Sequence, residues 1–206
     1  MATVLTIVLV SIVGYLAGSL NSSLLVGYVY GVDVRKHGSG NAGTTNTLRT
    51  LGKKAALLVF VGDVLKAIVA CVIGALLLGE AYNIEKFGIM TGGLAAVIGH
   101  NWPVYFRFKG GKGVLTSATV IFFMDYKTAL LLMGVFALVL IFTRYVSLAS
   151  ILASSGFPVV SALSGKDSVF IVFAFVLSMT ILFRHRKNLA RVFKGTENKI
   201  GQRQSY

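Results

Sequence analysis

The chain is poor in charge, and above all in acidic residues. Only 13% of its 206 residues are charged, whereas soluble domains carry about a quarter. Seven residues are acidic against 20 lysines and arginines, and 55% are hydrophobic. Together with a mean hydropathy of +0.79, this composition excludes an ordinary soluble domain and predicts one embedded in lipid. The chain is too short for a helical bundle plus a sizeable soluble domain, so we expect a single membrane domain over residues 1–200.

Cysteine is nearly absent too. Cys71 is the only one, so an intramolecular disulfide is excluded, and its apolar surroundings favour a packing role. The first charged residue is Asp33, so no basic region precedes the first apolar run, and we expect that run to remain as a helix rather than be removed as a signal peptide. Residues 201–206 carry no motif and are set apart as a C-terminal tail, for which an expression vector is one possible origin.

Charged residues divide the chain into apolar runs of helical length. A membrane span needs about 17–25 residues. Residues 1–32, 55–79, 87–106 and 145–165 reach that length, and 168–183 are slightly short. Residues 113–143 form two shorter runs separated at 125–127. The sequence therefore predicts an all-α transmembrane bundle of seven spans, with five spans plus a re-entrant hairpin as the alternative.

Basic residues gather in three clusters, at 35–54, 107–112 and 184–203. In a soluble protein a net charge of +13 would suggest nucleic-acid binding. In a membrane protein, Lys and Arg accumulate in cytoplasmic loops. An even number of expected spans separates successive clusters, so all three can lie inside. We therefore predict an outside N-terminus and a cytoplasmic C-terminus.

The first basic segment, residues 37–49, reads His-Gly-Ser-Gly-Asn-Ala-Gly-Thr-Thr-Asn-Thr-Leu-Arg. Its three glycines let the backbone approach a ligand closely, and amides at a helix start attract anions. Thr44 or Thr45 is expected to cap the following helix, with Arg49 about one turn on. We interpret the segment as phosphate-binding, with a flexible turn as the alternative. A G-x-G-x-x-G pattern is present, but a membrane span rather than a strand precedes it, so we do not predict a dinucleotide site.

The second basic segment, residues 99–113, contains Gly-His-Asn-Trp-Pro and then Lys-Gly-Gly-Lys-Gly. Its Trp102 is explained by the membrane interface. Lys109 and Lys112 place two ammonium groups on an adaptable backbone. That arrangement favours a phosphate clamp over contact with lipid headgroups, which needs no glycines.

The third basic segment, residues 183–191, begins where the last apolar run ends. His185 and Asn188 are three residues apart and so share a helix face. A basic flank that only anchors the last span is the alternative. All histidines of the chain (His37, His100 and His185) fall in the three segments, which predicts a shared site for a polyanionic substrate. The segments show no ligand-like spacing, so metal binding is not expected.

Asp63 and Lys66 lie one helical turn apart inside the second apolar run. Charges within a membrane usually pair with one another. We expect this pair to brace the bundle rather than to catalyse.

In order along the chain, the three basic segments resemble the motifs of the bacterial acyl-phosphate-dependent glycerol-3-phosphate acyltransferases of the inner membrane. The matching stretches are 38–46 with Arg49, 99–103 with 109–113, and 185–188 with Arg191 and 194–197. Gly62, Asp63 and Lys66 also fit. The resemblance implies a seven-helix fold, no cofactor and no metal, and an active site on the cytoplasmic face of the inner membrane.

The reaction that this resemblance implies moves an acyl group from acyl phosphate to the 1-hydroxyl of sn-glycerol 3-phosphate. Its products are 1-acylglycerol 3-phosphate (lysophosphatidate) and phosphate, in the first acylation of phospholipid synthesis. The implied partners are these two substrates and membrane lipid, not nucleic acid.

The family pattern also assigns residues to substrates. For glycerol 3-phosphate they are Ser39, Arg49, Lys112, His185 and Asn188, with Lys109 assisting. For acyl phosphate they are the backbone of Gly40, Asn41, Gly43, Thr44 and Thr45, with the Asn41 and Thr44 side chains nearby. The candidate catalytic residues are His100, His185 and Lys112. A general base is not evident, so either histidine or the substrate's own phosphate is considered for that role.

Two rival functions are a transporter of phosphorylated solutes and a lipid-phosphate phosphatase. A transporter would place polar residues deep in the spans, where this sequence has few apart from Asp63 and Lys66.

Overall fold

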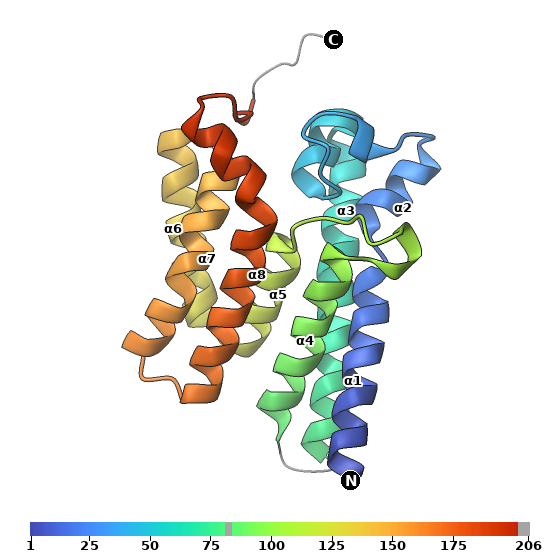
Figure 1. The fold of residues 1–206 in the computed structure, drawn as a ribbon, viewed down its shortest axis with the longest axis vertical. Helices are drawn as coiled ribbons and strands as arrows, with labels where there is room; N and C mark the ends of the chain where they lie inside the picture. The colour runs from blue at the N-terminus through green and yellow to red at the C-terminus, as the bar shows by residue number, and fades with distance from the viewer. Residues whose placement is uncertain (81–83, 202–206) are drawn as a thin grey trace. The chain divides into compact units, whose positions relative to one another are not determined.

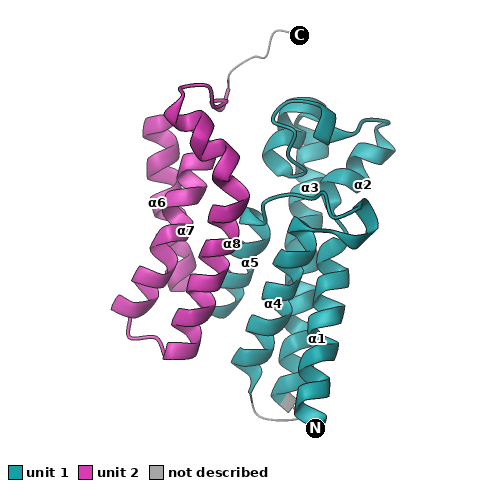
Figure 2. Ribbon diagram, in the orientation of Figure 1, with its two compact units in different colours: residues 1–124 teal, residues 125–206 magenta. Residues whose placement is uncertain are grey.

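A computed structural model describes residues 1–80 and 84–201, and within these ranges all regular structure is helical (Figure 1). This confirms that the fold is all-α, as predicted. Of the tail set apart in the sequence, only Gly201 is among the described residues. The chain divides into two compact units, residues 1–124 and 125–206 (Figure 2).

Unit 1 consists of five α-helices and three short helical turns. The α-helices are α1 (Ala2–Ser19), α2 (Ser22–Val29), α3 (Thr44–Ala75), α4 (Glu85–Asn101) and α5 (Val114–Met124). The turns are η1 (Val34–Lys36), the π-turn η2 (Leu76–Glu80) and η3 (Val104–Phe106). Within α3, Gly52 has a φ of 84° and breaks the helix, so the eight residues before it form a separate helical piece.

Glycines bring α1 and α4 into backbone contact. Gly14 faces the carbonyl oxygen of Gly92, which lies 2.7 Å from where a Cβ would be, and Gly18 faces the backbone of Ala96. Since both pairs advance in the same direction, α1 and α4 run parallel.

Helices α3 and α4 pack equally closely, but they run in opposite directions. Gly74 meets Gly88 backbone to backbone, and Ala70 meets Gly92. These pairs run in opposite order, so α3 is antiparallel to α4. Small residues, here glycine facing glycine or alanine, let two helix backbones approach this closely.

Helix α5 also runs antiparallel to α4, because Gly113 lies against Val97 and Val120 lies against Gly93. The connection from α1 to α3 and the connection from α4 to α5 therefore lie at the same end of unit 1 (Figure 1). The first and second basic segments occupy these connections.

Unit 2 is an antiparallel trio of α6 (Tyr126–Thr143), α7 (Val146–Leu163) and α8 (Ser168–Phe193). The predicted break at 125–127 is present, because Asp125 caps α6 by accepting hydrogen bonds from the amides of Lys127 and Thr128. At the opposite end of the trio, the amide of Ile200 donates to the carbonyl of Arg144 at 2.9 Å. The third basic segment lies at this second end.

Five helical stretches are long and apolar enough to cross a membrane: residues 2–29, 44–79, 126–143, 146–163 and 168–193. Exposed apolar side chains such as Leu5, Phe142 and Val172 suit a lipid surface. Helix α4 has 17 residues and α5 has 11, so the count of seven spans stays a prediction.

Candidate active site

Asn46 shapes the loop of the first basic segment. Its carboxamide oxygen accepts a hydrogen bond from the Ser39 amide at 2.8 Å, and its nitrogen donates to the carbonyls of Val34 and His37 at 2.8 and 3.1 Å. Gly38 has a φ of 60° and leaves no room for a Cβ against this carboxamide. A buried side chain thus fixes the backbone that carries Ser39.

Helix α3 begins at Thr44 with Gly43 at the N-cap position and no side-chain cap. The expectation that Thr44 or Thr45 would be the cap is wrong, because both already lie in the first turn. First-turn amides have no partner within their own helix, and the buried Thr44 hydroxyl also lacks a hydrogen-bond partner. Such a helix start suits an anion. Arg49 lies on the same helical piece and is half-buried.

The second basic segment folds back onto the end of α4. The Gly111 amide donates to the carbonyl of His100 at 3.1 Å. A Cβ on Gly111 would collide with Nε2 of His100 and with the carbonyl oxygen of Ala42. Because Ala42 belongs to the first basic segment, Gly111 marks the point where the two segments touch.

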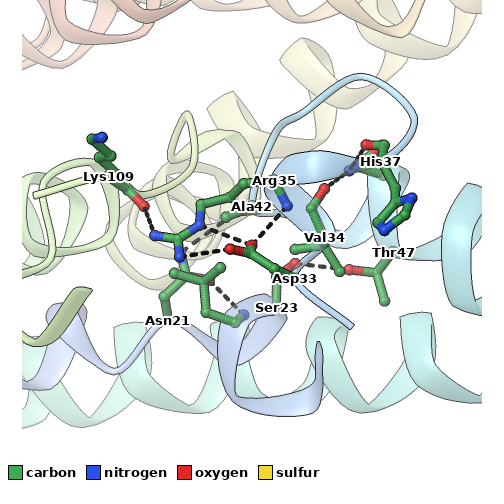
Figure 3. A network of polar contacts seen from close by, with 11 residues as sticks. Asn21, Ser23, Asp33, Val34, Arg35, His37, Ala42, Thr47 and Lys109 are labelled. Carbon is green, nitrogen blue, oxygen red and sulfur yellow. Dashed lines mark hydrogen bonds and ion pairs between the residues drawn. The ribbon is translucent and has the colours of Figure 1, made fainter. Parts of the chain in front are cut away.

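Asn21 lies fully buried beside this contact. Its side-chain nitrogen lies 3.5 Å from both the Ala42 and the His100 carbonyl oxygens, and its oxygen accepts from the amide of Leu24 at 3.1 Å to cap α2. Figure 3 shows Asn21 beside Ala42. Sequence reasoning missed Asn21 because it lies in an uncharged run, where Asn-Ser-Ser indicates only a helix start.

Arg35, two residues before the first basic segment, makes a second contact between this part of the chain and the second basic segment. Its guanidinium binds both carboxylate oxygens of Asp33 at 2.9 Å and donates to the carbonyl of Lys109 at 3.3 Å (Figure 3). The hydrogen bond from Arg35 holds the pKa of Asp33 below its ordinary value. An open groove of about 470 Å³ surrounds this contact, lined by Asp33, Arg35, Tyr105, Phe106, Arg107 and Lys109.

The predicted pairing of Asp63 and Lys66 is present, with 2.8 Å between Nζ and the carboxylate oxygen. The sequence did not reveal that His100 of α4 joins the pair, its Nδ1 lying 2.9 Å from Nζ of Lys66. Lys66 also donates to the carbonyl of Leu20 at 3.2 Å. All three charged or titratable side chains are buried, which agrees with a bracing role for the pair.

In unit 2, His185 and Asn188 lie on one buried face of α8, as their spacing predicted. Nδ1 of His185 lies 2.9 Å from the carbonyl oxygen of Ile181. Asn188 donates to one carboxylate oxygen of Glu197 and Arg191 to the other, both at 2.7 Å. Glu197, which sequence reasoning had recorded only as part of a motif, therefore positions the Asn188 amide.

The histidines differ in their surroundings. His37 is exposed, whereas His100 and His185 are buried in different units. Unit 1 carries the other predicted binding residues, from Ser39 to Lys112. Within residues 1–80 and 84–201, no three side chains of His, Cys, Asp or Glu lie close enough together to hold a metal ion.

Residues 8–195 match the sequence profile of a family described as glycerol-3-phosphate acyltransferase. A glycerol-3-phosphate acyltransferase of Thermoanaerobacter pseudethanolicus is 41% identical over 95% of this chain and 96% of its own length. One from Parasynechococcus marenigrum is 40% identical over 97% of this chain and 92% of its own.

A solved structure has the same fold. The crystal structure of PlsY (YgiH), an integral membrane glycerol 3-phosphate acyltransferase in its glycerol 3-phosphate form, matches with a TM-score of 0.86 and 37% identity, over 95% of this chain and 96% of that one. Its lysophosphatidic acid form matches with a TM-score of 0.84, 36% identity and 95% coverage of both chains.

Proposed function

Because the chain belongs to the glycerol-3-phosphate acyltransferase family, we propose that it transfers an acyl group from acyl phosphate to the 1-hydroxyl of glycerol 3-phosphate. The products are 1-acylglycerol 3-phosphate and inorganic phosphate. The observation that carries the choice of a phosphorylated donor is the uncapped start of α3, with its buried, partnerless Thr44 hydroxyl.

Acyl phosphate binds at this helix start. The backbone from Gly40 to Thr45 lines the phosphate. The Gly40 and Gly43 amides already donate to the carbonyls of His37 and Asn41, so the donors are the amides of the helix start at Thr44 and Thr45, and the Thr44 hydroxyl supplies one more. The positive end of the helix dipole adds to the attraction for phosphate. The neighbouring Asn41 side chain takes part in the same site.

Glycerol 3-phosphate is bound by Ser39, Arg49, Lys112, His185 and Asn188, with help from Lys109. In support, Asn46 fixes the Ser39 backbone and Glu197 orients the Asn188 amide. A guanidinium matches the geometry of a phosphate in a bidentate contact, and a lysine supplies a compact charge.

In the reaction, the 1-hydroxyl oxygen attacks the acyl carbon, a carbon–oxygen bond forms, and the bond to the phosphate oxygen breaks. The hydroxyl proton passes to a base, for which His100, His185 and a substrate phosphate are the candidates. Lys112 neutralises negative charge as it develops. Acyl phosphate is a mixed anhydride and already activated, so holding the two substrates in line supplies much of the rate.

The topology follows from the charge pattern. We place the three basic segments on the cytoplasmic face of a bacterial inner membrane, with the N-terminus outside and seven spans. Helix α4 counts as a span because it packs along α1 and α3, and α5 counts as a short one. Cysteine labelling of single-cysteine variants with membrane-impermeant and membrane-permeant reagents checks the orientation of the last span: Ser168→Cys should react from outside and Lys194→Cys only from inside.

The donor is tested with purified protein in detergent and a chelator, supplied in parallel with acyl phosphate and acyl-CoA. We expect lysophosphatidate from acyl phosphate alone. Product formed equally well from acyl-CoA contradicts the proposed donor. Free phosphate without acylated product indicates a phosphatase, and counterflow of labelled glycerol phosphate in proteoliposomes indicates a transporter.

A further inference from the structure

The Lys66 ammonium is surrounded by acceptors from three parts of unit 1. It contacts Asp63 of its own helix at 2.8 Å, the Leu20 carbonyl after α1 at 3.2 Å, and Nδ1 of His100 on α4 at 2.9 Å. An ammonium has three hydrogens to donate. Two of these contacts are hydrogen bonds and the one with Asp63 is an ion pair, so groups from three parts of unit 1 together position the Lys66 ammonium.

This contact decides where His100 carries its hydrogen. A neutral imidazole has one donor and one acceptor nitrogen, and the partner of one nitrogen fixes the role of the other. The Asp63 carboxylate also faces Nδ1 of His100, but at 3.6 Å it is too far away to accept a hydrogen bond. Since the Lys66 ammonium at 2.9 Å can only donate, Nδ1 accepts and the hydrogen lies on Nε2.

The other arrangement without net charge has a neutral lysine accepting from a protonated imidazole. That arrangement also leaves a hydrogen on Nε2. A buried cluster with net charge is strongly disfavoured, and Asp63 supplies the one negative charge of this cluster. In both neutral arrangements, Nε2 of His100 is therefore a donor and cannot take a proton.

His185 has the opposite arrangement. A carbonyl oxygen can only accept, so the contact with Ile181 places a hydrogen on Nδ1 of His185. The neutral ring then has its lone pair on Nε2. The two candidate bases are thus set in opposite tautomers by their surroundings.

Nε2 of His100 is directed at the junction of the two basic segments in unit 1. It borders Gly111 at the same place as the carbonyl oxygen of Ala42, since a Cβ on Gly111 would collide with both atoms. The His100 side chain is 4% exposed, so both ring nitrogens lie in the interior. A hydrogen-bond donor at this point can hold the two basic segments together, because the Ala42 carbonyl of the first segment is an acceptor beside it.

We propose that Lys66 and Asp63 are positioning residues that keep a hydrogen on Nε2 of His100, and that His100 fastens the first basic segment to the second instead of acting as the general base. This assignment removes His100 from the candidate bases of the proposed reaction. Only the expected kinetic effects rest on the proposed acyltransferase function; the position of the hydrogen does not.

The tautomer is read directly by nitrogen NMR of the wild-type protein, labelled with 15N-histidine in nanodiscs. The His100 signals are assigned by their loss in His100→Gln. We expect one-bond coupling to hydrogen at Nε2 of His100 and at Nδ1 of His185. A hydrogen on Nδ1 of His100 with none on Nε2 overturns the proposal, whatever the enzyme's activity.

Substitution of Lys66 tests the cause. In Lys66→Met, Nδ1 of His100 loses its donor, so the tautomer with a hydrogen on Nδ1 should appear and the KM for glycerol 3-phosphate should rise several-fold. Lys86→Met makes the same chemical change at an exposed position on α4 and should alter neither quantity. An unchanged His100 spectrum in Lys66→Met contradicts the role of Lys66.

Kinetics of His100→Gln separate positioning from base catalysis. The glutamine amide can donate near the place of Nε2 but cannot act as a base. We expect kcat to stay within about tenfold of wild type, whereas loss of a general base costs about 10²–10⁴-fold. A kcat loss in that larger range, with KM unchanged, overturns the positioning role.

The two kinds of failure are distinguishable. If wild-type protein transfers no acyl group from acyl phosphate, the proposed donor fails, while the NMR result still decides the state of His100. If the Lys66 and His100 variants cannot be purified in folded form, His37→Gln and His185→Gln assign the other two histidine signals, and the remaining wild-type signal supports or overturns the assignment.

Discussion

The carboxamide of Asn46 holds the backbone of Ser39, accepting its amide hydrogen at 2.8 Å. Asn46→Asp keeps this acceptor but replaces the nitrogen that donates to Val34 and His37 by an oxygen. Each buried carbonyl left without a partner costs about 1–3 kcal/mol. We expect lower thermal stability and at least a tenfold loss in kcat/KM for glycerol 3-phosphate. The control Leu48→Ala changes a neighbouring exposed side chain, and wild-type kinetics in Asn46→Asp would contradict the scaffold role.

Gly111 leaves no space for a side chain. Gly111→Ala would place a methyl group against Nε2 of His100 and the Ala42 carbonyl, so the second basic segment must move away from the first. Catalysis depends strongly on placement, and we expect kcat/KM to fall about 10²-fold, as happens when reacting groups are misplaced by about an ångström. Gly134→Ala on α6 meets nothing within 4 Å and should leave the activity intact. Equal activity of the two variants would show that the segments need not touch.

The stability of the protein at acid pH should depend on the ionisation of Glu197. Burial raises the pKa of this carboxyl, but hydrogen bonds from Asn188 and Arg191 outweigh burial and hold the pKa below its ordinary value of 4.5. A lowered pKa in the folded state means that the unfolded chain binds more protons, so the stabilisation is full above pH 4.5 and is lost as pH falls through the lower folded pKa. Glu197→Gln should lower Tm at neutral pH and flatten this acid decline.

Circular dichroism melts in detergent over that pH range provide the measurement. Glu85→Gln, the same change at an exposed carboxylate, is the matched control and should follow the wild-type curve. An acid decline in Glu197→Gln as steep as in wild type would assign the decline to other groups.

Arg35 should affect substrate binding by holding the backbone of Lys109 in place. In Arg35→Gln the Lys109 carbonyl loses its guanidinium partner and Asp33 loses the donor that lowers its pKa. A partly exposed contact of this kind contributes little to stability. We expect a small change in Tm and a several-fold rise in the KM for a phosphorylated substrate. Lys36→Gln, which removes a neighbouring exposed charge, should change KM less.

Features that depend on local sequence were predictable. The break at Asp125 followed from three polar residues between two apolar runs, and the pairing of Asp63 with Lys66 followed from their spacing of one turn. The shared face of His185 and Asn188 followed from helical periodicity. In each case the interacting residues lie within one helix or turn, so distance along the chain determines distance in space.

The contacts that build the site were not predictable in this way. Asn21 and Asn46 act through backbone carbonyls of distant segments, and carbonyls carry no sequence signal. His100 meets Lys66 only because Gly74 and Gly92 let α3 and α4 pack backbone to backbone. The sequence also predicted a helix cap at Thr44 or Thr45 that the structure does not have. The N-cap residue is Gly43, which has no side chain to signal the helix start in the sequence.

The close packing of α1, α3 and α4 also bears on the acyl chain of the substrate. Where Gly18 faces Ala96 and Gly74 faces Gly88, a single methyl group would already collide. A fatty tail therefore cannot pass between α1 and α4 or between α3 and α4 at these points, so these two interfaces cannot measure the length of an acyl chain. Any discrimination among chain lengths by unit 1 must then arise on its lipid-facing exterior, where the thickness of the surrounding bilayer can influence it.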